Sequence, residues 1–410
     1  DWQTGDIKTS TFTAVNGQGF FCDTNGGSFT VNLPAGSAGA IVSLQDYRNT
    51  FDTASLTVAP NGSEKINGGA GGGIVILSTE GEGITLVYID STVGWRSIQD
   101  NTFADPSSTN LTATGGSISD CGNFRIHTFT GPGTFCVSQI SGTAAENTVG
   151  YQVVAGGGAG GTGYYAAGGG AGGFREGRNA PIDNFTASPL VANAPTNAVT
   201  VTATGFPITV GGGGAASPVD TAKGGSGSNS QFSTIIAAGG GSGASRNCGS
   251  PGPAVTQGTD GGSGGGGTNH DPFSAASKGD GNTPPVTPSQ GNPGGSGGYG
   301  GGGGGAGAAG SCAPPGSPYG NVGGNGVSSS ITGSSVDRAG GGGGASDTTL
   351  RSGGSGGGGT SGRNSPQTTG TAGTANTGGG GGGGSNPTVT PTTAAGAGGS
   401  GIVIIRYKFQ

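Results

Sequence analysis

Residues 378–384 read GGGGGGG, and other glycine-dominated runs occupy 261–267, 301–305 and 340–344. These runs belong to one long stretch, 156–401, in which short glycine blocks alternate with loops. Glycine offers almost no apolar area to bury, so this stretch cannot fold around a hydrophobic core. Glycine also loses the most backbone freedom on folding. The stretch is therefore either an unfolded linker or a structure that something other than a core holds together.

Composition alone favours a linker, because abundant glycine and proline without a strict repeat usually indicate disorder. Three features of the stretch oppose that interpretation. Its eight acidic and eight basic residues all lie between the glycine runs. The loops are rich in Pro, Thr, Ser and Asn, which are turn-forming residues. The stretch also ends on a strong strand pattern, 402–407, which a free linker would not need. We therefore predict that 156–401 is ordered.

The ordered alternative is a bundle of polyglycine II helices, which are extended, left-handed and have three residues per turn. These helices make no internal hydrogen bonds, so each N–H and C=O must pair with a neighbouring chain or with water. Bare glycine lets the helices approach closely enough for backbone to pair with backbone. We predict about twelve crossings of the bundle by such segments.

The two ends of the glycine stretch predict its polarity. The strand at 149–154 runs into the first glycine block, and the strand at 401–409 emerges from the last one. We expect both strands to share a sheet with one wet face, because Arg406 and Lys408 alternate with apolar residues. An even number of crossings then puts one set of loops at the far end of the bundle. These far-end loops are 162–167, 215–223, 244–260, 306–322, 345–352 and 385–395.

The rest of the chain reads as β structure with no helix signal longer than a turn. Residues 1–103 contain short alternating strand patterns, as at 29–33 and 84–88, which predict a sandwich or small barrel. Residues 104–120 are a polar linker. Residues 121–155 with 402–410 form a small sheet, in which 124–129 and 134–137 are expected to pair as a hairpin. The predicted fold class is mostly β with a polyglycine II bundle and essentially no α-helix.

Charge and composition exclude several classes of protein. The chain has 410 residues, of which 9% are charged, and its net charge is −6. Residues 1–103 hold ten acids and four bases, so they account for the whole imbalance. No basic patch indicates nucleic-acid binding. No apolar run is long enough to insert into a membrane.

Residues that could carry catalysis are sparse. The five cysteines include no CxxC motif and the chain has only two histidines, so we expect no metal site. His127 alternates along a strand and is expected to be structural. His270 has no nucleophile motif nearby. Glu80 and Glu82 read as solvated turn residues rather than a glycan-cleaving pair. We therefore expect no cofactor and no enzymatic activity.

Two parts of the sequence resemble parts of virion proteins. The series 12–15, 21–24, 30–35, 56–63 and 86–90, with Gly94-Trp95, is similar to a β module of bacteriophage tail fibres and other virion appendages, notably in marine phages. The region 124–137, the glycine-rich insert and the closing Gly-Ile-Val-Ile-Ile-Arg-Tyr resemble glycine-rich phage fibre tips. In those tips, variable loops cap polyglycine-helix bundles.

The resemblance implies a protein on the virion surface that attaches the particle to its host. Its expected partners are a host glycan or outer-membrane protein and other virion proteins, and such fibres are usually trimers. Two alternatives remain open. One is a structural coat or decoration protein without a receptor. The other is an ice-binding glycine-rich protein, although long stretches here break the strict Gly-x-x period typical of such bundles.

The far-end loops hold the candidate recognition residues, because specificity needs placed side chains and the glycine blocks have none. Aromatic residues and arginine make efficient contacts, although ordinary loop anchors would look the same. The candidates are Tyr164, Tyr165, Asp220, Arg246, Tyr319, Asp347 and Arg351. Cys248 and Cys312 fall at the same predicted end, and a disulfide between them is possible in an oxidising exterior.

Overall fold

A computed structural model describes residues 1–98, 110–163, 165–217, 223–245, 256–268, 278–297, 299–312, 320–385 and 395–410. Its regular elements are strands together with one short 3₁₀ helix, η1 (Ala144–Asn147), in the described part of the chain. This confirms the predicted β-rich, essentially α-free fold class. Within the same residues, no helix has the length and apolar character needed to cross a bilayer.

The chain divides into two compact units. The first comprises Asp1–Asn110 with Ser141–Ala144, and the second comprises Leu111–Ile140 with Ala145–Gln410. The first unit contains two sheets, in the orders β1-β3-β5-β8-β9 and β2-β4-β6-β7. Their strands are β1 (Trp2–Lys8), β2 (Phe12–Thr13), β3 (Gln18–Cys22), β4 (Phe29–Asn32), β5 (Ile41–Asp46), β6 (Leu56–Ala59), β7 (Val75–Leu77), β8 (Gly83–Asp90) and β9 (Gly94–Ser97).

The two sheets of the first unit share one apolar core, as a β-sandwich requires. Alternate residues of most of these strands point into it, so that Val42 and Leu44 are buried while Ile41 is exposed. Trp95 is fully buried, and its indole N–H donates to Glu64 Oε2 over 3.1 Å. The strands predicted at 29–33 and 84–88 lie in these sheets.

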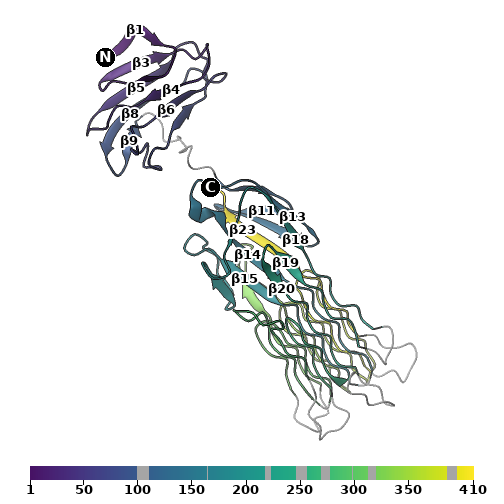
Figure 1. Ribbon diagram of the computed structural model, residues 1–410. Coiled ribbons are helices and arrows are strands. Elements are labelled where there is room, and N and C mark those ends of the chain that lie inside the picture. Colours follow the sequence, from purple (N-terminus) through teal and green to yellow (C-terminus); the bar gives the residue numbers. More distant parts are fainter. Residues whose placement is uncertain are drawn as a thin grey trace. The chain divides into compact units, whose positions relative to one another are not determined.

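The second unit also begins with two sheets (Figure 1). We call the seven-stranded one, β11-β12-β23-β14-β15-β16 with β17 beside β14, the closing sheet, and the five-stranded one, β10-β13-β18-β19-β20, the facing sheet. The closing sheet contains β11 (Ser117–Cys121), β12 (Phe124–Phe129), β14 (Thr148–Val154), β15 (Phe174–Arg178), β16 (Val191–Asn193), β17 (Val199–Thr200) and β23 (Ile402–Lys408). The facing sheet contains β10 (Thr112–Thr114), β13 (Gly133–Gln139), β18 (Gly205–Thr209), β19 (Ser230–Phe232) and β20 (Ile235–Ala237).

The predicted hairpin of 124–129 with 134–137 is wrong. β12 pairs with β11 and β23 in the closing sheet, whereas β13 pairs with β10 and β18 in the facing sheet. The turn between them carries the chain from one sheet to the other. Phe129 and Phe135 both lie in the core between the sheets. The burial of these two rings stabilises the crossing of the chain between the sheets. The predicted linker is also too long, because β10 and most of β11 fall within 104–120.

The C-terminal strand returns to the start of the glycine stretch, as predicted. β23 lies between β12 and β14 and is antiparallel to both, with Ile404 opposite Thr128 and Gln152. One face of β23 places Val403, Ile405 and Tyr407 in the core between the two sheets. This pairing fixes both ends of the glycine stretch at the closing sheet.

We predicted that the other face of the closing sheet is exposed to solvent. This prediction is wrong. Ile402 and Ile404 belong to a second core, which Phe185, Val327 and Ile331 complete. The last two belong to the segment formed by β21 (Val327–Ser329), β22 (Val336–Arg338) and their connection, which lies far from the closing sheet in sequence.

Arg406 belongs to this covered face, and the residue is only 2% exposed. Its guanidinium donates to the carbonyl of Ile331 and to Asn184 Oδ1, at 3.1 and 2.9 Å. It also stacks over the ring of Phe124 at 4.2 Å. These partners, which lie on three different segments, allow a charged side chain to be buried.

The glycine stretch is ordered by hydrogen bonds between backbone segments. Three successive amides, Gly157, Gly158 and Ala159, donate to the carbonyls of Gly399, Gly170 and Gly225, at 2.9, 2.8 and 3.0 Å. Bonding to three different segments in turn is what a helix with three residues per turn requires. The segments run away from the sheets of the second unit and return to them (Figure 1).

The prediction of about twelve crossings is too low, because some glycine blocks reverse direction internally. In block 294–305, Gly295 donates to Gly302 across such a reversal, at 2.7 Å. The predicted far-end loop 306–322 is wrong at its start, because Ala306 packs with Val154 and Phe174 at the closing sheet. Glycine accepts the backbone conformations of a tight turn, so a glycine block can reverse direction without a proline or asparagine that would show the turn in the sequence.

Candidate functional site

Loops at the end of the bundle opposite the closing sheet carry the side chains that the glycine segments lack. Backbone contacts bring three of these loops together. The amide of Ala345 donates to the carbonyl of Ala166 at 2.8 Å. A Cβ atom on Gly300 would lie only 2.1 Å from that same carbonyl oxygen. The absence of side chains at this point therefore lets residues near 165, 299 and 346 meet.

Asp347 is the centre of this cluster. Its Oδ2 accepts hydrogen bonds from the hydroxyls of Tyr299 and Tyr165, at 3.0 and 3.4 Å. Its Oδ1 accepts one from the side-chain amide of Asn364, at 2.7 Å. A carboxylate can only accept, so both phenol protons are directed at Asp347. The backbone amides of Asn364 and Ser365 also donate to the carbonyl of Asp347, at 3.0 and 2.8 Å. One side chain thus joins its own loop to three others.

The two tyrosines of this cluster form a half-buried aromatic pair. Their ring centroids are 3.9 Å apart, and the ring planes meet at 53°. Tyr165 has a φ of +60°, which is an uncommon conformation for a bulky residue. Backbone strain of this kind persists where surrounding contacts hold it, and it concentrates at binding sites. The contacts with Tyr299 and Asp347 help to hold it here.

The structure brings together two of the candidate residues and separates a third. Tyr165 and Asp347 meet in the cluster described above. Arg351 lies farther along the same loop, where its backbone N–H and C=O pair with Ser361. The candidates that fall outside the described residues are Tyr164, Asp220, Arg246 and Tyr319.

The proposed disulfide also involves a position outside the described residues, Cys248. Cys312 is an exposed free thiol, and its sulfur accepts a hydrogen bond from the amide of Ser296 at 3.2 Å. The pairing of the two cysteines stays a prediction.

Sequence reasoning missed Tyr299 and Asn364. Tyr299 was assigned to the interior of the block 294–305, where it is the single bulky residue. That side chain was the available signal, because a bundle packed through bare backbone has no room for a tyrosine. Asn364 carried no comparable signal, since asparagine is common in ordinary loops.

Of the histidines considered for catalysis, His127 has a structural role, and His270 lies outside the described residues. His127 is fully buried, and burial lowers its pKa. Its Nδ1 lies 2.7 Å from the carbonyl of Gly115, which can only accept, so Nδ1 carries the proton and Nε2 accepts from the hydroxyl of Tyr407 at 3.2 Å. Among the residues that the structure describes, no three His, Cys, Asp or Glu side chains gather to hold a metal ion.

Comparison with known proteins identifies the family to which the second unit belongs. A family model described as a glycine-rich domain matches residues 128–408, which is more than half of the chain. The chain belongs to the glycine-rich domain family. The match runs from the last residues of β12 to the end of β23, so this domain includes the closing strand and the whole bundle. No curated protein matches the chain.

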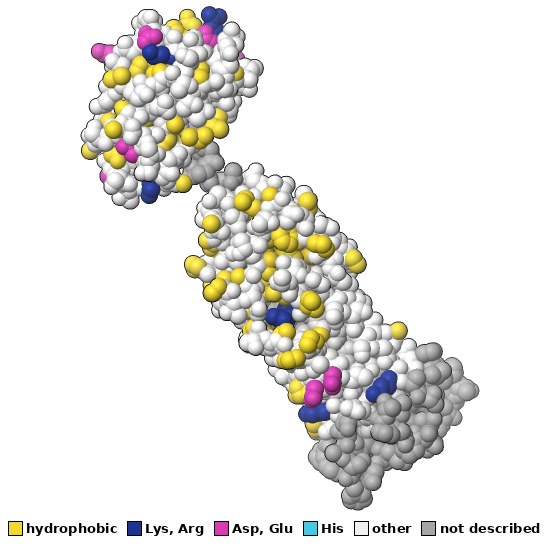
Figure 2. Space-filling model, viewed as in Figure 1, with side chains coloured by type: hydrophobic (Ala, Val, Ile, Leu, Met, Phe, Trp, Pro, Cys, Tyr) yellow, Lys and Arg dark blue, Asp and Glu magenta, His cyan; other side chains and the backbone are white. Residues whose placement is uncertain are grey.

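The glycine-rich domain therefore consists of a sandwich, which the closing and facing sheets form, the polyglycine bundle, and the loops that cap the bundle. Figure 2 shows few charged side chains on the visible face of the second unit, and most of them lie toward the loop end of the bundle. The rest of that face is mostly white, the colour of backbone and uncharged polar side chains, with hydrophobic side chains scattered over it. Within the described residues, this distribution makes the loop end the chemically distinctive part of the bundle.

Proposed function

We propose that the chain is a non-enzymatic phage fibre or appendage protein that recognises the host surface through the far-end loops of its glycine-rich domain. The expected receptor is a host glycan or an outer-membrane protein. The expected location is the surface of the virion, where the first unit contacts other virion proteins. By analogy with phage fibres, the working state is a homotrimer.

The observation that carries this proposal is the cluster around Asp347. A bundle of bare glycine presents only backbone groups, which discriminate poorly between surfaces. The cluster holds two tyrosines from separate loops in one arrangement before any partner arrives. A preorganised aromatic pair loses less entropy on binding than a pair on free loops. Loops on a rigid support can also vary without disturbing the fold.

The direct test is host adsorption by particles that carry substituted protein. Tyr165→Ala with Tyr299→Ala is expected to reduce adsorption, while the particle still assembles. Asp347→Asn should have a weaker effect in the same direction, because it keeps the side-chain volume but loses the charge that orders both hydroxyls. Tyr47→Ala is the matched control, since Tyr47 is an exposed tyrosine of the first unit, 49% accessible.

Two outcomes of this experiment oppose the proposal. Unchanged adsorption in the double tyrosine variant would remove the cluster from the recognition surface. Particles whose adsorption survives replacement of all the far-end loops would favour a structural coat or decoration protein. Immunogold labelling of intact particles then tests the location, and release of sugar from host glycans tests whether the chain is an enzyme.

A further inference from the structure

The outermost strand of the closing sheet, β11, is a regular edge strand. It pairs with β12 over five residues, from Ser117 opposite Thr128 to Cys121 opposite Phe124. The two-residue turn between them starts with Gly122, whose φ is +58°. Such a turn makes the flanking residues a hydrogen-bonded pair, and hydrogen-bonded pairs alternate along the ladder. The backbone groups of Ile118 and Asp120 therefore point away from the sheet.

These outward-facing groups are open to a partner. Residues 117–120 are exposed, and no hydrogen bond from the described residues reaches the outward groups of Ile118 and Asp120. Ile118 itself is 49% accessible. An exposed edge of this kind is a template for another strand.

Other edges in the described sheets carry protection that β11 lacks. β1 contains Asp6 and Lys8, and its register with β3 shifts. β10 has three residues, and its register with β13 also shifts. Charges, irregular register and short length are the usual devices against unwanted pairing. β11 has no proline or lysine, pairs regularly with β12, and its one charged residue is neutralised, because Asp120 is bonded to Arg125 at 2.8 and 3.0 Å.

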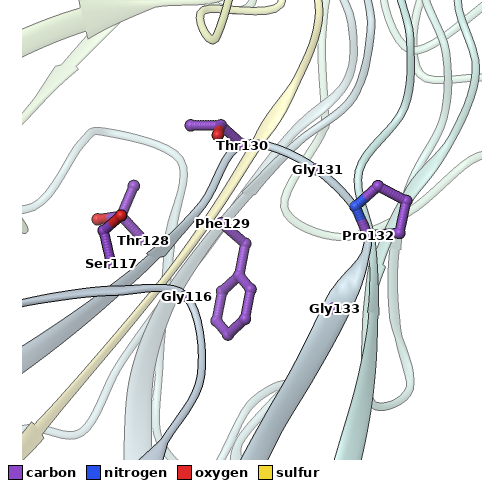
Figure 3. A pocket seen from close by; sticks show the side chains of 8 residues that line it. All are labelled: Gly116, Ser117, Thr128, Phe129, Thr130, Gly131, Pro132 and Gly133. Carbon is purple, nitrogen blue, oxygen red and sulfur yellow. The ribbon is translucent and has the colours of Figure 1, made fainter.

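A pocket of about 230 Å³ adjoins the first residue of this edge (Figure 3). Ser117 belongs to both the edge and the pocket, and the ring of Phe129 lies between Gly116 and Gly133. Ser117, Thr128 and Thr130 are among the residues that line it, and none of their hydroxyls has a hydrogen-bond partner among the described residues. The lining contains no charged side chain. The pocket therefore suits a compact, uncharged side chain with a polar tip.

We infer that β11 and this pocket bind an extended, uncharged segment of a partner protein, which adds as a strand to the closing sheet. A polypeptide backbone supplies donors and acceptors at the spacing that the outward groups of Ile118 and Asp120 present. The pocket selects one side chain of the segment. Because the edge and the pocket are both electrically neutral, a charged segment gains nothing there and loses hydration. This site is independent of the far-end loops.

The test uses the full chain and an array of short, uncharged peptides rich in Thr, Val and Asn. Ile118→Pro removes the outward N–H without breaking a bond to β12, since that N–H faces solvent. Ile118→Ala keeps the N–H and is the matched control. Peptides that bind the native chain and the Ile118→Ala variant, but not Ile118→Pro, support the site. An array that captures no peptide, or peptides that bind Ile118→Pro equally well, would overturn it.

Amide exchange locates the bound peptide and shows whether each variant is folded. On saturation with the selected peptide, exchange at Ile118 and Asp120 should slow about tenfold, as two modest backbone hydrogen bonds would produce. Protection of β23 amides should match the native chain in both variants. A dimer of the free chain that Ile118→Pro dissociates would mean that a second copy occupies the edge, which contradicts a partner segment. Thr130→Lys should weaken peptide binding by blocking the pocket, and undiminished binding would exclude the pocket from the site.

Discussion

The sandwich and the bundle of the second unit are held together in opposite ways. In the sandwich, large side chains such as Phe135, Phe232 and Tyr407 fill the space between two sheets. In the bundle, the space between segments is closed because side chains are missing. A Cβ atom on Gly158 would lie 2.2 Å from the carbonyl oxygen of Gly241. One region therefore fails when side-chain atoms are removed, and the other fails when they are added.

This contrast also concerns what each region can recognise. The sandwich uses its side chains for its own stability, whereas the bundle has almost none to use. Specific contacts in the glycine-rich domain must then come from loops and from strand edges. The cluster around Asp347 lies on loops, and the site at β11 is a strand edge.

The largest expected effect is in the sandwich. Phe135→Ala should lower the free energy of unfolding by about 3–5 kcal/mol, because it leaves a cavity where a buried ring contacts other rings. Thr134→Ala, at the exposed neighbouring position, should change stability little. Urea unfolding of the full chain measures both. A similar loss in the two variants would contradict the core assignment.

The second prediction concerns pH and the covered face of the closing sheet, where Asp183 lies 3.9 Å from the guanidinium of Arg406. Burial raises the pKa of Asp183 from 3.8 to about 6. Because the folded state holds the proton more tightly, the stabilisation is complete below about pH 4 and is lost as the pH rises through about 6. The shift corresponds to about 3 kcal/mol at most.

Asp183→Asn should remove this dependence, so the stability of the variant relative to the native chain should rise between pH 4 and pH 7. The measurement is the difference between the two unfolding free energies from pH 4 to pH 7. Taking the difference cancels His127, whose lowered pKa acts with the opposite sign. A constant difference across this range would show that Asp183 does not titrate there.

The third prediction tests the bundle by adding atoms. Gly158→Ala should destabilise the domain by about 1–3 kcal/mol, because the new methyl group meets backbone that cannot rotate away. Gly212→Ala is the matched control within the bundle, since a Cβ atom there has nothing within 4 Å. Local amide exchange around residues 157–173 is the most direct readout. Equal effects at the two positions would mean that the bundle is not closely packed.

The sequence predicted the individual elements of the fold better than it predicted which elements pair with one another. The alternation of Ile405, Tyr407 and Phe409 with Arg406 and Lys408 predicted a strand, and the glycine runs predicted helices that pair through backbone. Both inferences depend on local chemistry. The supposed hairpin of β12 and β13 failed because strand patterns do not say which sheet a strand joins. At the candidate site, Tyr165 and Asp347 were predicted, but their meeting with Tyr299 was not.

By itself, the sequence determined that this protein has β sheets and a backbone-bonded glycine bundle, because alternation and the absence of side chains act locally. Only the tertiary structure decided which surfaces are covered. Arg406 reads as a solvent-facing residue, yet Phe124, Asn184 and Ile331 bury it, and all three come from segments far away in the chain. Likewise, the loops around Asp347 meet because bare backbone packs closely beneath them. Contacts between distant segments leave no local pattern, so the fold alone brings these residues together.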